Sequence, residues 1–273
     1  MLRTAGRYSR ALWRNPRRTI DSRSPMATAD RICMRAIKAL VLLSITVAGG
    51  CLEFEQTVTL SADGSGSQRV RMAVREGVLR EIQRMTPAAQ LGAGANPTAV
   101  FDEQLVRKEL TAAGLELTAH ESGRQAERRS VDLTATFADF AALQQSPLCG
   151  SAAEWSIGDG PRPETAKLTL YPQGRAAWIE ARQKATAMQD ASDPVVAEFF
   201  AKRKQQLAGL DVVVRFRLPG DVLVWTANME KTGEREVTAH LTSARIETAH
   251  DLVRWLAPRF EVIFDAKGCT LPR

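Results

Sequence analysis

Residues 51–75 have the sequence CLEFEQTVTLSADGSGSQRVRMAVR, which is the clearest fold signal in the chain. Apolar and polar side chains alternate from Leu52 to Leu60 and again from Val70 to Val74. A period of two is typical of strands that bury one face. The segment between them, Ala62-Asp63-Gly64-Ser65-Gly66, is rich in turn residues. The stretch therefore predicts a β-hairpin that begins directly after Cys51.

Further alternating segments predict a second hairpin, a three-stranded meander and a final strand. Their expected bounds are 115–121 with 130–137 around a turn at Ser122-Gly123-Arg124, then 210–218, 222–228 and 235–241, and 260–264. Helices are expected at 77–85, 101–113, 175–191, 193–207 and 248–256, with a loop at 86–99. Adjacent hairpins favour an α+β fold with a mostly antiparallel sheet and helices packed on one face.

The segment before Cys51 has the features of a secretion signal. The uncharged run from Ala39 to Gly50 follows Arg35 and Lys38 and ends in small residues. A membrane-spanning helix needs about 20 apolar residues, so this shorter run predicts a cleaved signal peptide over residues 1–50. The remaining chain is divided into residues 51–145 and residues 146–273, which we expect to form one continuous domain.

The end of this segment, Val47-Ala48-Gly49-Gly50-Cys51, resembles the lipobox of bacterial lipoproteins. Ala48 and Gly49 depart from the commonest residues of that motif. The resemblance implies that the Cys51 thiol receives a diacylglyceryl group and that the new amine is acylated, for example with palmitate. It also implies a location in the bacterial cell envelope, outside the cytoplasm. An ordinary signal peptide, or a buried helix with an unmodified cysteine, is the alternative.

The position of the start codon is open. Residues 1–33 are rich in arginine and lack hydrophobic periodicity. Translation from Met34 would give a leader of ordinary proportions, and Met26 would also serve. The alternative is a long basic region that begins at Met1.

The basic character of the whole chain comes from the leader. The 273 residues carry a formal charge of +6. Residues 1–50 contain 10 of the 37 basic residues but only 2 of the 31 acidic ones, so the rest has a net charge of −2. The chain after the leader therefore lacks the basic footprint of a nucleic-acid-binding protein, and we expect no such partner.

Two of the four cysteines are candidates for a disulfide. Cys33 lies in or before the leader and Cys51 is the predicted lipidation site, which leaves Cys149 and Cys269. Disulfides are common in oxidising compartments outside the cytoplasm. We therefore predict a Cys149–Cys269 bond, with two buried thiols as the alternative.

Two segments together resemble the LppM-type envelope lipoproteins. One is CLEFEQTVTLSADGSG at residues 51–66, and the other is the strand-rich segment 210–241 with Leu218-Pro219-Gly220. The tryptophan usual in the strand after the glycine turn is missing, and Trp225 lies one strand earlier. The resemblance implies an α+β envelope lipoprotein, and some relatives are linked to lipid binding. It carries no binding residue over to this chain.

Signatures of catalysis or metal binding are lacking in the sequence. His120, His240 and His250 have no metal-ligand spacing, and there is no GxSxG, SxxK or phosphate-binding loop. We expect no cofactor, no metal and no enzymatic activity. Trp178, Trp225 and Trp255 are interpreted as core residues. Lys202-Arg203-Lys204 is interpreted as a solvated helix face, with contact to anionic headgroups as the alternative.

These observations predict a lipid-anchored envelope protein that works as a non-enzymatic binding or interaction module. Its expected partners are the membrane, through Cys51, and an envelope protein or lipid. The alternative is a carrier or sensor of lipid or another apolar ligand, with a pocket between the sheet and the helices at 175–207.

Overall fold

The first hairpin has the predicted strands and turn. The computed structural model describes residues 52–85, 99–150, 152–187, 197–198, 200–201, 204 and 207–272. Strands β1 (Leu52–Leu60) and β2 (Gly66–Arg75) pair in register over their full length. In the turn, the Asp63 carboxylate accepts hydrogen bonds from the Ser65 backbone N–H and hydroxyl at 2.9 and 2.6 Å. Gly64 has a φ of 87°, which favours glycine.

The hairpin lies within a seven-stranded sheet, called here the large sheet. Its strand order is β3-β4-β2-β1-β7-β10-β9. The further strands are β3 (Leu115–Gln125), β4 (Arg128–Phe137), β7 (Leu210–Arg217), β9 (Glu230–Gly233) and β10 (Glu236–Thr242). The β1–β7 pair is parallel, and the other neighbours are antiparallel.

The second hairpin is confirmed, but its predicted turn is wrong. Ser122, Gly123 and Arg124 continue β3 and pair with β4. The chain reverses at residues 126–127, where Ala126 has a φ of 51°. The polar composition of the 122–124 segment reflects solvent exposure at the sheet edge rather than a turn.

The predicted meander is also wrong in its middle strand. Strand β8 (Val222–Trp225) leaves the large sheet and joins a second, four-stranded sheet of order β5-β6-β11-β8. This small sheet also contains β5 (Glu154–Asp159), β6 (Thr165–Tyr171) and β11 (Phe260–Asp265). The departure begins at Gly220, where an added Cβ would lie 1.8 Å from the Asp265 carbonyl oxygen. Only glycine permits this approach to β11, so Pro219-Gly220 connects two sheets instead of closing a hairpin.

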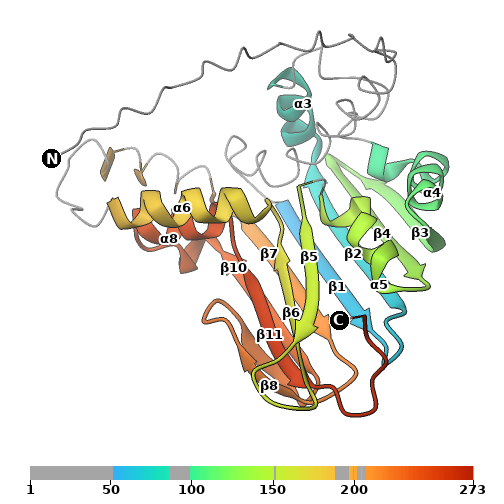
Figure 1. The fold of residues 1–273 in the computed structure, drawn as a ribbon. Coiled ribbons are helices and arrows are strands. Elements are labelled where there is room, and N and C mark those ends of the chain that lie inside the picture. Colours follow the sequence, from blue (N-terminus) through green and yellow to red (C-terminus); the bar gives the residue numbers. More distant parts are fainter. Residues whose placement is uncertain are drawn as a thin grey trace, which may run out of the picture.

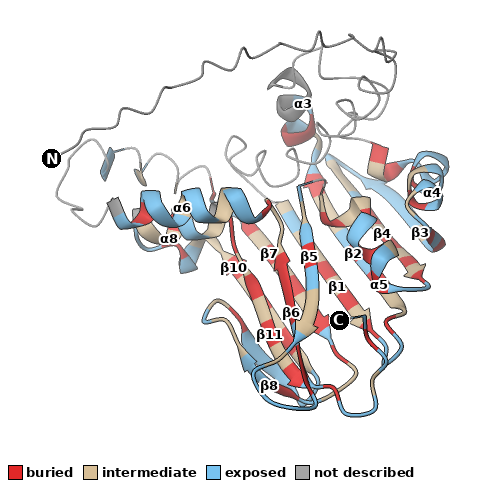
Figure 2. Ribbon diagram, in the orientation of Figure 1, coloured by how far each residue is buried: buried red, intermediate tan, exposed pale blue. Residues whose placement is uncertain are grey.

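The two sheets face each other across the hydrophobic core (Figures 1 and 2). Trp155 of β5 and Phe216 of β7 meet edge to face with ring centroids 6.0 Å apart. Phe216 also contacts Phe260 of β11 at 6.1 Å. Burial alternates along β1, β4, β7 and β10 of the large sheet, so one face of these strands is buried and the other is not. The expected α+β class holds as mixed content with mostly antiparallel strands. However, the small sheet covers the buried face of the large sheet around Phe216, where helices were expected.

The helices lie around the sheets rather than in one layer over them (Figure 1). They are α3 (Glu76–Met85), α4 (Glu103–Ala112), α5 (Phe140–Gln145), α6 (Arg175–Ala187) and α8 (Ala249–Leu256), with 3₁₀ turns η3 (Ala99–Phe101), η4 (Pro147–Cys149) and η5 (Ser243–Arg245). Asp102, Asp139 and Thr248 are N-caps, and Thr248 forms a capping box with Asp251. No helix in the described part of the chain is long and apolar enough to cross a bilayer.

Several predictions concern residues outside the described ranges. These are the leader at 1–50 with Cys51, the loop at 86–98, and the start of the helix expected at 193–207 with Lys202 and Arg203.

Candidate functional site

The face of the large sheet that points away from the small sheet is the candidate site, and we call it the outer face. It is formed by alternate residues of each strand. On β1, Glu53 is exposed and Glu55, Thr57 and Thr59 are half-buried, whereas Gln56, Val58 and Leu60 on the opposite face are buried. The same alternation holds on β4 and β10. No second layer therefore covers the described side chains of this face.

A chain of ion pairs crosses five strands of the outer face. We call it the ion-pair ladder, and its members in strand order are Asp132 on β4, Arg69 and Arg71 on β2, Glu55 on β1, Arg215 and Arg217 on β7, and Glu236 on β10.

The geometry is tightest at the two ends and in the middle of the ladder. Asp132 accepts two hydrogen bonds from the Arg69 guanidinium at 2.9 and 2.6 Å. Arg215 lies 2.7 Å from Glu55 and 3.4 Å from Glu236. Arg71 connects the halves, at 3.2 Å from Asp132 and 3.6 Å from Glu55. The ladder therefore fixes charged side chains of alternating sign in defined positions.

The ladder lowers the pKa values of two of its carboxylates. Hydrogen bonding from Arg69 lowers the pKa of Asp132, against the opposing effect of burial. Burial raises the pKa of Glu236, but hydrogen bonds from Arg217 and Thr232 and the charges of Arg217 and Arg215 outweigh it, so the net shift is downward. Both groups are thus hydrogen-bond acceptors rather than proton donors at neutral pH.

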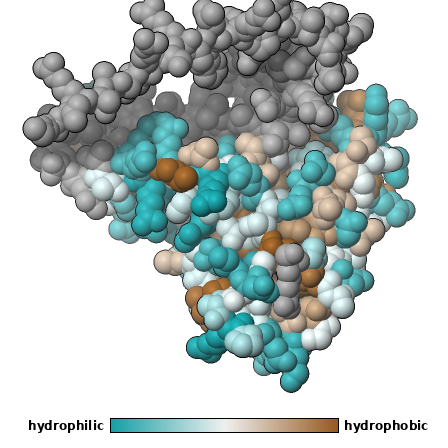
Figure 3. All heavy atoms as spheres, in the orientation of Figure 1, coloured by the Kyte–Doolittle hydropathy of each residue, from teal (hydrophilic) through white to brown (hydrophobic). Residues whose placement is uncertain are grey.

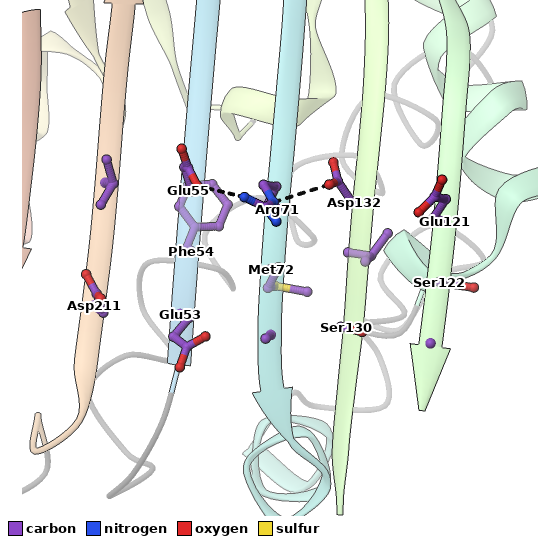
Figure 4. Close-up of a pocket in the computed structure, with 14 residues that line it drawn as sticks. Glu53, Phe54, Glu55, Arg71, Met72, Glu121, Ser122, Ser130, Asp132 and Asp211 are labelled. Atoms are coloured by element: carbon purple, nitrogen blue, oxygen red, sulfur yellow. Dashed lines mark ion pairs between the residues drawn. The ribbon is translucent and has the colours of Figure 1, made fainter. Parts of the chain in front are cut away.

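A hollow of about 600 Å³ lies on the outer face beside the ladder (Figure 4). Its small lining residues include Ala73, Gly123, Ser130 and Val213 on four different strands. Charged side chains stand around them: Glu53, Glu55, Arg71, Glu121, Asp132 and Asp211. The lining of the open hollow also includes Phe54, Met72 and Val131, so it is about equally polar and apolar, and its charged residues are mostly acidic.

The acidic residues of the hollow differ in their partners. Glu53 lies 2.5 Å from Arg128, and Asp211 lies 2.8 Å from His240. Glu121 is exposed and forms no ion pair with the described residues. This arrangement can bind groups that donate hydrogen bonds or carry positive charge. No set of three or more His, Cys, Asp or Glu residues among the described ones has the geometry of a metal site.

A buried polar cluster lies on the opposite face of the same strands. The Cys149 sulfur accepts hydrogen bonds from the side-chain amides of Gln56 and Gln68 at 3.2 and 2.9 Å. Ser146 donates to the Gln68 oxygen at 2.6 Å. Burial raises the pKa of the Cys149 thiol to about 11. A buried thiol with a raised pKa is chemically inert, so the cluster holds the η4 turn against the sheet.

The structure does not contain the predicted disulfide, because Cys149 and Cys269 are both thiols. Cys149 lies within the glutamine cluster described above. The tail around Cys269 is held elsewhere: the Thr270 N–H donates to the Ala62 carbonyl in the first hairpin turn at 2.7 Å. The tail therefore bonds to the β1–β2 turn instead of the 146–150 loop.

The three histidines lie in separate places, and each has an ordinary environment. The His120 ring contacts the Val100 carbonyl at 3.0 Å, and His240 contacts Asp211 on the outer face. His250 is half-buried in α8. Trp225 and Trp255 are partly buried and pack against the core. Trp178 is half-buried and lies outside that core cluster, and Trp155 is buried.

Comparisons with known proteins add little. No family model matches the chain, and no curated protein matches it. Among solved structures, the chain is similar to the folded domain of the LppM protein of Mycobacterium tuberculosis, determined by NMR. The TM-score is 0.38 at 12% identity, over 80% of this chain and 91% of that one.

Proposed function

We propose that the protein is a lipid-anchored, extracytoplasmic envelope protein that works as a non-enzymatic interaction module. The proposal rests on one observation: the fold begins directly after the lipobox-like sequence. The motif ends at Cys51, and β1 begins at Leu52. Such an arrangement holds a folded domain directly at a membrane surface.

The outer face is the proposed binding surface. A protein surface that presents fixed charges and hydrogen-bond acceptors favours a partner with complementary charge. The ion-pair ladder keeps these groups in place before binding, which reduces the entropy lost on association. The acidic residues that dominate the charged lining of the hollow favour a basic segment of another envelope protein.

The anchor is tested with two matched cysteine variants. Cys51→Ala removes the predicted acyl acceptor, and Cys33→Ala removes the cysteine that lies in or before the leader. We expect the Cys51→Ala protein to lose acylation and leave the membrane fraction, with the Cys33→Ala protein unchanged. Continued membrane association of Cys51→Ala with unchanged mass would contradict the anchor.

The binding surface is tested with two variants of the same strand. Glu121→Lys reverses a charge at the hollow, and Glu116→Lys makes the same change on β3 outside the hollow. Captured envelope proteins and lipids are identified by mass spectrometry. We expect a protein partner that Glu116→Lys retains and Glu121→Lys loses. Equal capture by both variants would contradict the assignment of the hollow. A stoichiometric co-purified lipid would favour the carrier alternative.

A further inference from the structure

Helices α6 and α8 lie at the end of the large sheet from which residue 51 departs. Leu52 pairs with Leu210 at the start of β7, and Asp211 pairs with Thr242 at the end of β10. Helix α8 follows β10 after the short η5 turn, and α6 packs against α8 (Figure 1). The proposed lipid attachment point and α6 are therefore at the same end of the molecule.

Helix α6 presents an aromatic side chain flanked by cations. The Trp178 ring lies 4.9 Å from the Arg259 guanidinium and 5.6 Å from that of Arg182. Tyr171 lies beside it at 5.6 Å between ring centroids. The next residue, Ile179, is 42% exposed. A small hydrophobic patch stands among hydrophilic side chains on the surface over α6 (Figure 3). An indole, an exposed aliphatic side chain and guanidinium groups thus occur together on one short helix.

Positive charge is available at this helix for a partner. Arg175 and Arg182 are exposed and form no ion pair with the described residues. The glutamates of α6 and β11 form ion pairs with nearby cations: Glu180 pairs with Lys184 at 2.6 Å, and Glu261 pairs with Arg259 at 3.8 Å. The Glu154 carboxylate accepts the Arg175 backbone N–H at 3.1 Å. The side-chain charges left unpaired on α6 are therefore positive.

We propose that Arg175, Trp178, Ile179 and Arg182 form a membrane-contact surface that lies against the headgroups of an anionic bilayer. The proposal rests on the proposed function, because the anchor at Cys51 brings this end of the molecule to the bilayer. Tryptophan is enriched at the interface between bilayer and water. Arginine side chains near an anionic leaflet are attracted to it.

The experiment uses the mature, acylated protein in vesicles of phosphatidylcholine with phosphatidylglycerol. Lipids brominated near the headgroup quench the fluorescence of nearby tryptophans. We expect quenching of a component that Trp178→Phe removes and Trp225→Phe retains. The quenching is expected to weaken in phosphatidylcholine alone and at high salt, because salt screens exposed charges.

Charge variants separate the contact surface from the anchor. Arg175→Glu combined with Arg182→Glu is expected to lower the quenching, and Lys267→Glu, at the opposite end of β11, is not. Two results would overturn the contact surface and leave the anchor intact. One is equal quenching in all charge variants, and the other is an absence of quenching from Trp178 in an acylated protein that floats with the vesicles. A protein that carries no acyl mass and does not float would overturn the anchor, and the contact surface with it.

Discussion

Arg215 is the residue on which the ion-pair ladder depends most, and its replacement tests whether the ladder stabilises the sheet. Its guanidinium lies 2.7 Å from Glu55 on β1 and 3.4 Å from Glu236 on β10. Its side chain is 26% exposed, and those of the two carboxylates are 31% and 25% exposed. Arg215→Met keeps the aliphatic part of the side chain and removes both ion pairs.

The expected cost follows from the number of pairs and their exposure. An exposed ion pair contributes about 0.2–1 kcal/mol to stability. These two pairs are partly buried and belong to a network, so we expect a loss of about 1–2 kcal/mol in the free energy of unfolding at pH 7. The loss is expected to shrink at high salt, since the Debye length falls to about 3 Å at 1 M.

The dependence on pH has a definite sign. A carboxylate with a lowered folded-state pKa stabilises the fold above its unfolded-state pKa, and this stabilisation is lost as the pH falls through the folded-state value. The pKa of Glu236 lies below its usual 4.5. The difference in the free energy of unfolding between wild type and Arg215→Met should therefore be complete at pH 7. It should disappear as the pH falls through the folded-state pKa of Glu236 and this carboxylate becomes protonated.

Urea unfolding measures these differences, with Arg162→Met as the matched control. Arg162 is exposed in the β5–β6 loop and has no ion pair among the described residues. We expect this control to change stability by less than about 0.5 kcal/mol. A loss below about 0.5 kcal/mol for Arg215→Met at pH 7, or a loss that persists after the carboxylates are protonated, would refute the reasoning.

Two further predictions concern the core and the first turn. Burial raises the pKa of Cys149 from 9.0 to about 11. The free energy of unfolding, measured relative to that of Cys149→Ser, should therefore fall by about 2–3 kcal/mol as the pH rises from 9.0 to about 11. In the folded protein at neutral pH, Cys149 should resist alkylation, and mass spectrometry that finds it oxidised to Cys269 would contradict the thiol pair. Gly66→Ala would place a Cβ 2.0 Å from the Thr59 carbonyl oxygen, so it should destabilise the protein by more than about 2 kcal/mol. Gly77→Ala in α3 meets no atom within 4 Å and should be neutral or stabilising, and equal effects of the two glycine changes on thermal unfolding would contradict this account.

The parts of the fold that the sequence predicts are local. The β1–β2 hairpin could be predicted because Val58, Leu60, Val70 and Val74 bury one face and leave a period of two in the sequence. The parallel pairing of β1 with β7 joins residues far apart in the chain. It depends on which strands become neighbours, and alternation within a strand contains no information about that.

The ion-pair ladder and the buried polar cluster were not predicted from the sequence, for different reasons. Glu55 and Arg215 are ordinary outward residues of two strands, and their pairing becomes apparent only when the strands are adjacent. Gln56 and Gln68 did leave a signal, because Gln56 lies between Phe54 and Val58 on the core-facing side of its strand and Gln68 precedes Val70 on that of the next. A buried amide needs a hydrogen-bond partner, so these positions indicated a polar contact beneath the sheet.

The intact mass of the protein extracted from the membrane fraction decides whether an acylated Cys51 anchors it there. We expect a chain that begins at Cys51, with a diacylglyceryl group on its thiol and an acyl group on its amine. A chain that begins upstream of residue 51, or a mature chain with an unmodified Cys51, would contradict it.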